Sequence, residues 1–540
     1  MKNTRIILPL VLLLAIFGNG QTTGIIPQPL QVVAEEGKYT ITPSTIIIAD
    51  SANKENADYL QELLKVEHQK ELKIKRRGGK GIILNHNPQL TQKLGEEGYT
   101  LMVDNSSISI SAGTTTGVFY GIMSLRQLLG IDNVNKKEKL SIAGISIEDS
   151  PRFKWRAFML DEGRYFKGTE QVKKLLDEMA LLKMNVFHWH LTDDQGWRLE
   201  IKKYPKLTQL GSTRSNSQIG GWDSEERSNT PHSGYYTQEQ VKEIIAYAKE
   251  RQITIIPEIE MPGHASAAIA AYPWLGTIGE LKAVPTVFGK LPDSFNVSDP
   301  RVYEFLENVL KEVMELFPSN IIHIGGDEVK FDSWKSSEEI QNYMNKNGLA
   351  SPADLHVFFT NRISNYLNKN GHRMMGWNEI LGENVHEWQD ASDMEVKENL
   401  AQNTLVHFWK GNLDLVSKAV QDGYEIVNSH HEYSYLDYSF KSIPLEKAYS
   451  FDPIPEGLAE SFQHKIIGSG CQMWGEWIPE AIDMDRMIFP RIAAYAEVGW
   501  TSKTRKDYGV FRSNLDRLLS RWRSQGISLP AKFEKVNFEE

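Results

Sequence analysis

The sequence predicts an α/β fold in which a (β/α)8 TIM barrel follows a small α+β domain. After Pro151, apolar strands alternate with amphipathic helices, as in a parallel sheet with crossover connections. Eight strand candidates follow over about 350 residues, enough for a barrel with insertions. Acidic, histidine and tryptophan residues gather at the carboxyl ends of these strands, where barrel enzymes build their active sites.

The first twenty residues have the layout of a cleavable signal peptide. Lys2 and Arg5 precede the apolar run 6–17, and small residues follow it. The run is shorter than the ~20 apolar residues that a membrane-spanning helix needs, although a permanent anchor is the alternative reading. We therefore expect residues 1–20 to be a signal peptide, the protein to be periplasmic or secreted, and no segment to span a membrane.

Composition limits the possible functions. The chain is 41% apolar and 24% charged, which is ordinary for a globular protein. The net charge of −10 becomes −12 without Lys2 and Arg5, so the basic surface of a nucleic-acid-binding protein is not expected. Cys471 is the only cysteine, which excludes an intramolecular disulfide, and we expect it to be buried. Nothing in the sequence indicates an oligomeric state.

Residues 21–150 have a mixed pattern that predicts the α+β domain. The break at Asp149-Ser150-Pro151 closes it. Its predicted strands are 46–48, 82–84, 99–103 and 107–111, and its predicted helices are 54–66 and one with its apolar face over 118–129.

Residues 151–503 form the predicted barrel. A capping box at Thr237–Gln240 starts one of its helices. Residues 504–540 form a helical tail that we expect to pack on the barrel, with Trp522 in its core. The predicted barrel strands are 158–161, 185–191, 254–258, 320–324, 373–377, 405–409, 425–428 and 466–473.

The segment His323-Ile324-Gly325-Gly326-Asp327-Glu328 indicates the reaction chemistry. Consecutive strand residues point to opposite faces, so Asp327 and Glu328 can share one cavity only where the strand ends or bulges. The two glycines permit such a backbone. Two neighbouring carboxyls raise the pKa of one of them, which would leave one proton donor and one anion. The alternative is a pair of solvated loop carboxylates.

Tryptophans end three of the predicted strands. Trp377, Trp409 and Trp474 could line one cavity. Aromatic walls with a few polar contacts suit the apolar C–H faces of sugar rings. The sequence therefore predicts an enzyme that acts on carbohydrate.

Several ordered motifs resemble glycoside hydrolase family 20, the β-N-acetylhexosaminidases. The motifs are Trp155 to Asp161, His190 to Arg198, Pro257 to His264 and His323 to Glu328. The likeness covers nearly the whole mature chain, since residues 21–150 also resemble that family's N-terminal domain.

The resemblance implies an exo-acting retaining glycosidase that removes terminal β-linked N-acetylglucosamine or N-acetylgalactosamine from oligosaccharides or glycoconjugates. Catalysis would be substrate-assisted, with an oxazolinium-type intermediate in place of an enzyme nucleophile. Glu328 would be the general acid and base, and Asp327 would orient the acetamido group. Tyr435 would donate to the acetamido carbonyl. No cofactor or metal is implied.

The resemblance also implies the substrate-binding residues. His264 would tune the acid through a carboxylate relay, for which Glu260, four residues earlier, is the candidate in place of an aspartate. Arg156 would clamp the outer hydroxyls of the sugar. The other implied binding residues are Asp194, Trp377, Trp409, Asp437, Trp474 and Glu476.

Three alternatives stay open. The pair His188 and His190 could hold a metal in a metal-dependent barrel hydrolase, with His264 and His323 as further ligands. Glu260 or Glu476 could be the nucleophile of an ordinary retaining glycosidase. The protein could also be a non-catalytic glycan-binding protein on the same fold.

Overall fold

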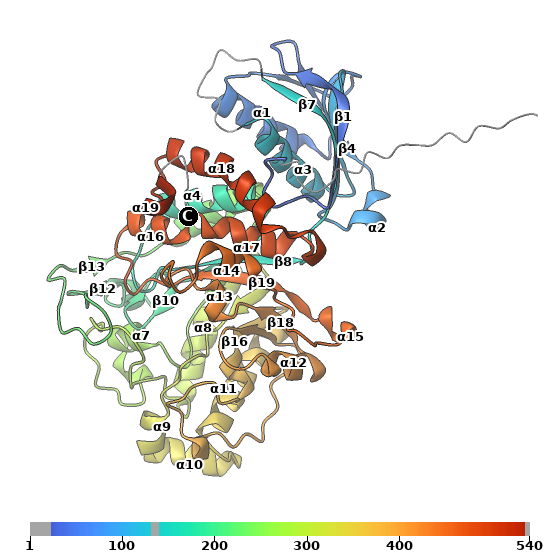
Figure 1. Cartoon of the computed structure of the whole chain (residues 1–540). Helices are drawn as coiled ribbons and strands as arrows, with labels where there is room; N and C mark the ends of the chain where they lie inside the picture. Colours follow the sequence, from blue (N-terminus) through green and yellow to red (C-terminus); the bar gives the residue numbers. More distant parts are fainter. Residues whose placement is uncertain (1–22, 131–139, 535–540) are drawn as a thin grey trace, which may run out of the picture. The chain divides into compact units, whose positions relative to one another are not determined.

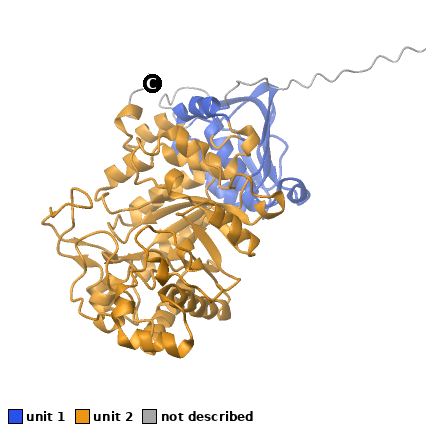
Figure 2. Cartoon of the chain, turned by 60° about the horizontal axis from the view of Figure 1, so that its bottom comes forward, with its two compact units in different colours: residues 1–25, 29–150, 507–517 blue, residues 26–28, 151–506, 518–540 orange. Residues whose placement is uncertain are grey.

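The computed structural model describes residues 23–130 and 140–534 (Figure 1), so the predicted signal peptide lies outside the described residues. The chain forms two compact units, coloured separately in Figure 2. Of the described residues, 23–25, 29–150 and 507–517 belong to the first unit, and 26–28, 151–506 and 518–534 belong to the second. Among the described residues, no helix combines the length and apolar character needed to cross a bilayer.

The first unit is an α+β domain built on a seven-stranded sheet of order β1-β7-β5-β6-β4-β2-β3. Helices α1 and α3 cover one face of the sheet (Figure 1). All the predicted strands and helices of this domain are present. The elements are β1 (Gln31–Thr40), β2 (Ile46–Ala49), α1 (Lys54–His68), β3 (Lys73–Lys75), β4 (Gly81–His86), α2 (Leu90–Leu94), β5 (Tyr99–Val103), β6 (Ser107–Ala112), α3 (Thr115–Leu128) and β7 (Ser141–Asp149).

Three strands of this sheet, β1, β3 and β7, were not predicted. β1 and β3 expose most of their side chains, so they lack the apolar signal of a buried strand. β1 instead owes its conformation to antiparallel pairing with β7, more than a hundred residues away along the chain. Such long-range pairing is not visible in local sequence.

The second unit is a closed barrel of eight parallel strands, in the order β14-β15-β16-β17-β18-β19-β8-β9. All eight predicted strands are confirmed, and so is the predicted fold class. The strands are β8 (Trp155–Asp161), β9 (Val186–His190), β14 (Thr254–Glu258), β15 (Ile321–His323), β16 (Arg373–Trp377), β17 (Leu405–Phe408), β18 (Glu425–Asn428) and β19 (Ile466–Met473).

Helices and short hairpins connect the barrel strands. The predicted capping box is present at the start of α6, where Thr237 and Gln240 cap each other's backbone N–H. The short strands are β10 (Thr192–Asp193), β11 (Gly196–Trp197), β12 (Thr213–Arg214) and β13 (His232–Ser233). The helices are α4 (Thr169–Leu181), α5 (Lys206–Gln209), α6 (Gln238–Glu250), α7 (Ser266–Ala271), α8 (Pro300–Leu316), α9 (Asp332–Ser336), α10 (Glu338–Asn347), α11 (Pro352–Lys369), α12 (Asp414–Gln421), α13 (His431–Ser434), α14 (Leu445–Ser450), α15 (Glu460–Gln463), α16 (Ala481–Ile488) and α17 (Arg491–Trp500).

The C-terminal tail is divided between the two units. Its main helix, α18 (Tyr508–Ser524), belongs to the first unit up to Arg517 and to the barrel unit from Leu518. Trp522 is fully buried, as expected, and its indole N–H donates to Glu178 of α4 at 2.7 Å. Residues 507–517 thus group with the first unit, and for them the expected packing on the barrel stays a prediction. A short helix, α19 (Ala531–Glu534), follows.

The interior of the barrel changes character from one end to the other. An apolar layer fills the part near the start of the strands, formed by Trp155, Ala157, Val186, Ile256, Met375, Leu405, Val427 and Ile467. Nearer the carboxyl ends the buried residues are His188, Glu258, His323 and His407. The apolar layer supplies the packing, and the polar layer carries the residues of the site above it.

Candidate active site

The acid pair follows strand β15, where the backbone leaves regular strand geometry. Gly325 and Gly326 have φ angles of +66° and +89°, and Glu328 itself has φ +51°. A Cβ atom on Gly325 would lie 1.8 Å from a carboxylate oxygen of Glu260, so a larger residue there would have to displace that buried carboxyl and adopt a strained backbone. The predicted irregular backbone at the two glycines is thus present. It brings Asp327 and Glu328 to the same imidazole, that of His264.

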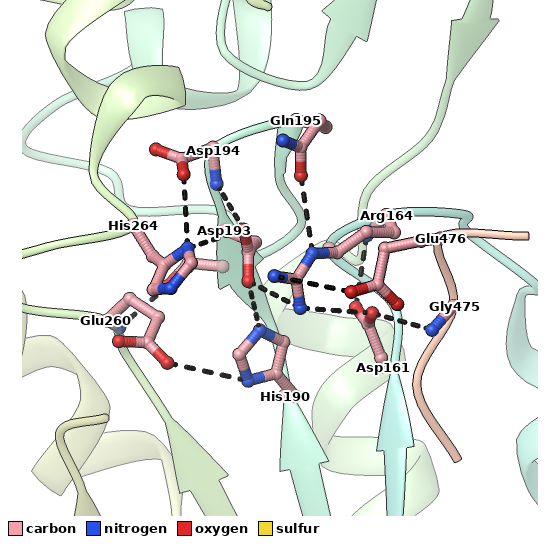
Figure 3. Close-up of polar contacts among 12 residues, drawn as sticks. Asp161, Arg164, His190, Asp193, Asp194, Gln195, Glu260, His264, Gly475 and Glu476 are labelled. Atoms are coloured by element: carbon pink, nitrogen blue, oxygen red, sulfur yellow. Dashed lines mark hydrogen bonds and ion pairs between the residues drawn. The ribbon is translucent and has the colours of Figure 1, made fainter. Parts of the chain in front are cut away.

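His264 joins the acid pair to a buried aspartate. Its Nε2 lies 3.8 Å from Oδ2 of Asp327 and 3.8 Å from Oε2 of Glu328. Its Nδ1 lies 3.1 Å from Oδ2 of Asp194 and 3.4 Å from Oδ1 of Asp193 (Figure 3). Asp194 is fixed in turn by the backbone N–H and the hydroxyl of Ser266, at 3.0 and 2.6 Å. This contact chain is the geometry of a carboxylate–histidine relay.

The relay carboxylate was assigned wrongly from the sequence. It is Asp194, with Asp193 beside it, and not Glu260. The Glu260 carboxyl lies 3.8 Å from Nδ1 of His190, and among the described residues neither of its oxygens has a hydrogen-bond partner. Burial and the charge of Asp327 raise the pKa of Glu260 well above its ordinary value. Glu260 is therefore a neutral carboxyl packed against the glycine turn.

The acid pair has an uneven proton affinity. Burial raises the pKa of Asp327 to about 7, and the carboxylates of Glu379 and Glu328 add to this effect. Burial would also raise the pKa of Glu328, but His264 and Lys290 hold it below its ordinary value. Lys290 Nζ lies 3.3 Å from Oε1 of Glu328. The pKa of one carboxyl of the pair is raised, as predicted. In the free protein that carboxyl is Asp327 and not Glu328.

A charged cluster lies beside the relay at the ends of β8 and β9 (Figure 3). Arg164 Nη1 lies 2.7 Å from Oδ2 of Asp193 and 3.3 Å from Oδ2 of Asp161, and its Nη2 lies 4.0 Å from Oε1 of Glu476. Glu258 and Asp193 raise the pKa of His190 to about 10 against the effect of burial, which makes it an imidazolium. The charges alternate, so each buried ion has an opposite partner.

Arg156 does not belong to the site, which corrects the prediction that it clamps the sugar. It is the second residue of β8, at the amino end of the barrel strands, and is 1% exposed. Its guanidinium donates to the backbone carbonyls of Lys183 and Phe153. Arg164 follows the carboxyl end of the same strand and is the arginine that reaches the site. Its position just after a predicted barrel strand could have indicated Arg164 as a site residue.

The predicted aromatic walls lie together. Trp377, Tyr435 and Trp474 form one buried cluster, against which Trp409 packs. The rings of Trp409 and Tyr435 are stacked, with centroids 5.9 Å apart. Trp377 donates its indole N–H to Glu258 at 2.8 Å, and Trp409 donates to Glu379 at 2.9 Å. Glu379, two residues after β16, was not predicted as a site residue, although its position after a barrel strand could have indicated it.

Several buried polar atoms of the site are left without partners. Among the described residues, Oδ1 of Asp327, Oδ1 of Asp437 and Nε1 of Trp474 make no hydrogen bond within the protein. Burial and the neighbouring Glu476 raise the pKa of Asp437 well above its ordinary value. Unpaired buried polar groups are costly, so their gathering beside aromatic walls indicates the place of a polar ligand with apolar faces.

The histidines of the metal alternative surround a carboxylate. Nε2 of His188 lies 2.9 Å and Nδ1 of His190 lies 2.6 Å from the same oxygen, Oε2 of Glu258. One nitrogen of His188, one of His323 and one oxygen of Glu258 lie within 4.8 Å of one another, close enough to share an ion. Yet Glu258 already neutralises His190 and accepts from Trp377, so the cluster has an internal role that needs no ion.

The barrel, the acid pair with its relay and the aromatic walls define a barrel-type glycosidase. Two family models match the chain: glycosyl hydrolase family 20, catalytic domain, over residues 153–503, and glycosyl hydrolase family 20, domain 2, over residues 22–150. The chain therefore belongs to glycosyl hydrolase family 20. The resemblance seen in the motifs is confirmed.

Known proteins agree with this assignment. The chain is 35% identical to a β-hexosaminidase of Porphyromonas gingivalis, over 93% of this chain and 64% of that protein. It is 32% identical to a β-hexosaminidase of Vibrio furnissii, over 89% of this chain and 77% of the relative. The chain thus spans under two thirds of the Porphyromonas relative.

Solved structures also resemble the fold. An exo-β-N-acetylglucosaminidase of Vibrio harveyi in complex with N-acetylglucosamine superposes with a TM-score of 0.81, at 32% identity over 95% of this chain and 79% of that one. A mutant β-hexosaminidase of Streptomyces plicatus with its product GlcNAc superposes with a TM-score of 0.77, at 28% identity over 94% of this chain and 96% of that one.

Proposed function

We propose that this chain is an exo-acting retaining β-N-acetylhexosaminidase that hydrolyses terminal β-linked N-acetylglucosamine or N-acetylgalactosamine by substrate-assisted catalysis. The observation that carries the proposal is the unpaired Oδ1 of buried Asp327 beside the cluster of Trp377, Tyr435 and Trp474. An acetamido group offers an N–H for that oxygen, a carbonyl for a hydroxyl donor and a methyl for the aromatic walls. Both solved structures named above hold N-acetylglucosamine, in one of them as the product.

In the proposed reaction Glu328 gives its proton to the glycosidic oxygen as the bond to C1 breaks. The acetamido carbonyl oxygen attacks C1 from the opposite face and closes an oxazolinium ring. Asp327, as an anion, accepts from the acetamido N–H and stabilises the positive charge that forms there. Glu328 then takes a proton from water, which opens the ring and restores the retained configuration.

In the proposed reaction, substrate binding moves the proton of the acid pair from Asp327 to Glu328. Without ligand, the higher pKa belongs to Asp327. An acetamido N–H bound to Asp327 favours its charged form and lowers its pKa. A leaving group at Glu328 displaces Lys290 from that carboxyl, which raises the pKa of Glu328. Both changes transfer the proton to the group that must donate it.

Arg164, Asp437 and Glu476 are proposed to bind the sugar hydroxyls. Arg164 is already oriented by Asp161 and Asp193, so its remaining donors are fixed in direction. Asp437 has an unpaired oxygen, and Glu476 lies beside Arg164. These three groups would hold the outer edge of the ring while the acetamido group lies against Asp327.

The deciding experiment compares an aryl β-N-acetylglucosaminide with the matching aryl β-glucoside, for the wild type and for Asp327→Ala. Hydrolysis confined to the acetamido substrate, and mostly lost in the variant, is the expected result. Comparable cleavage of both glycosides would overturn substrate assistance and favour a carboxylate nucleophile. Turnover of neither would favour a non-catalytic glycan-binding protein.

We also propose that the protein is exported to the periplasm or secreted, on the strength of the charged and apolar pattern of residues 1–20. Mass measurement of the protein recovered from cell fractions tests this proposal. Loss of about twenty residues in an exported fraction would support it, and an intact chain retained in the cytoplasm would overturn it.

A further inference from the structure

Two lysines lie over the ring of Trp388, and one of them also pairs with the proposed proton donor Glu328. Trp388 is 37% exposed, and its indole ring stacks on the imidazole of His386 with centroids 5.0 Å apart. His386 Nε2 hydrogen-bonds Oε1 of Glu379 at 2.8 Å, and the other oxygen of Glu379 accepts from Trp409. Trp388 is therefore tied through three contacts to a wall of the site, and is not an isolated surface tryptophan.

Lys290 places Trp388 beside the leaving-group side of the reaction. Its Nζ lies 3.3 Å from Oε1 of Glu328 and 5.6 Å from the centre of the Trp388 ring. The ammonium group of Lys290 thus lies close to both the Trp388 ring and the proton donor Glu328. Glu328 protonates the oxygen that joins the terminal sugar to the next unit, so that next unit emerges beside Trp388.

A second lysine lies over the same ring without a carboxylate partner. Lys330 Nζ is 4.4 Å from the centre of the Trp388 ring. Within residues 23–130 and 140–534, no carboxylate makes an ion pair with Lys330. Lys290 is paired with Glu328, whereas Lys330 adds a positive charge, unpaired among the described residues, beside Trp388, in a chain whose net charge is −10. Their positive charge attracts anions, and the indole attracts the apolar face of a sugar ring.

We propose that Trp388, Lys330 and Lys290 form a leaving-group subsite that prefers a sugar ring bearing a carboxylate or a sulfate. The sugar ring stacks on Trp388 and its anionic substituent pairs with Lys330. An anion here also competes with Glu328 for Lys290, which frees the proton donor as the leaving group binds. The inference rests on the proposed function and names the class of glycan on which it acts.

The test uses matched disaccharides. N-acetylglucosaminyl-β-1,4-glucuronate and N-acetylglucosaminyl-β-1,4-glucose differ only at C6, and the 6-sulfate of the second supplies the other anion. Release of N-acetylglucosamine gives kcat/KM for each. We expect the wild type to favour at least one anionic substrate by about fivefold, as for a partly exposed ion pair, and less at high salt. Preference for the glucuronate, the sulfate or both identifies the anion.

Variants assign the preference to the subsite. Lys330→Met should bring the anionic-to-neutral ratio close to one, and Lys330→Arg should retain it. Lys369→Met removes an equal charge at the end of α11, just before the amino end of β16, and should leave the ratio unchanged. Thermal unfolding shows whether each variant is folded.

Failure of the proposed subsite and failure of the proposed function give different results. Equal kcat/KM for all three disaccharides, or a ratio unaffected by Lys330→Met, in an enzyme that hydrolyses the aryl N-acetylglucosaminide would overturn the subsite alone. Failure to hydrolyse the aryl substrate would overturn the proposed function, and the subsite with it.

Discussion

Nδ1 of His264 lies 3.1 Å from Oδ2 of Asp194, although the two residues are 70 positions apart in the chain. The contact turns the other nitrogen of the ring toward Asp327 and Glu328. Against the effect of burial, Asp193 and Asp194 raise the pKa of His264 well above its ordinary value, so the ring is an imidazolium. A buried positive charge thus stands beside the acid pair.

Asp194→Asn should weaken this arrangement without removing the side chain. The amide cannot balance the imidazolium, so the pKa of His264 should fall and its support of the acid pair with it. We expect kcat to fall by about 10- to 100-fold, with a changed pH profile. Asp483→Asn, at a partly exposed aspartate that pairs with Arg486 on the surface of α16, is the control. An unaltered kcat and profile in Asp194→Asn would rule out the relay.

Glu328→Gln should separate substrates by their leaving groups. A good leaving group, such as dinitrophenolate, departs without a proton, whereas an alkoxide does not. We expect kcat/KM for a methyl glycoside to fall by at least about 100-fold, and for a dinitrophenyl glycoside by far less. Steady-state rates on both substrates measure this. An equal loss on both would show that Glu328 is not the proton donor.

Lys290→Met should move the pH limb that Glu328 controls. Lys290 lowers the pKa of Glu328, so its removal should raise that pKa and shift the limb to higher pH, by up to about one unit. The limb set by Asp327, with its pKa raised to about 7, should stay in place. The pH dependence of kcat/KM for a methyl glycoside tests this, because so small a leaving group does not reach Trp388.

Asp327→Asn should stabilise the fold at high pH while abolishing most activity. The pKa of Asp327 is raised to about 7 in the folded state. Its ionisation therefore lowers the free energy of unfolding as pH rises from the pKa of the unfolded state to about 7. Asparagine stays neutral, so the variant should gain about 1–4 kcal/mol over the wild type above pH 7 and nothing below about pH 4. Chemical unfolding at both pH values measures the difference. A pH-independent difference would contradict a raised pKa for Asp327.

Arg164→Lys and Arg156→Lys should have opposite consequences. Arg164 faces the proposed substrate site, so its replacement should lower kcat/KM by about 10- to 100-fold, mainly through KM. Arg156 donates to buried backbone carbonyls at the amino end of the barrel, so its replacement should lower the melting temperature and leave KM unchanged. Kinetics and calorimetry on both variants separate the roles. A higher KM in Arg156→Lys would restore the original assignment.

The barrel could be predicted because each strand is a short apolar run between amphipathic helices. β14, β16, β18 and β19 begin and end at the predicted residues. The glycine turn before Asp327 and the tryptophans at strand ends were also visible, because special backbone angles and strand termini leave local marks. β1 left none, since its conformation depends on a distant partner strand.

Contacts between distant segments were decided only by the tertiary structure. The family resemblance implied Glu260 as the partner of His264, but the chain turns so that Asp194, between β10 and β11, contacts the imidazole. The resemblance likewise assigned Arg156 to the sugar, and only the direction of β8 decided that Arg164 lies at the site instead. The proton of the acid pair depends on Lys290, from yet another loop. The sequence determined which strands form the barrel and which residue types gather at its rim, because those patterns are local. Which side chains meet there depends on how separate loops fold over the barrel.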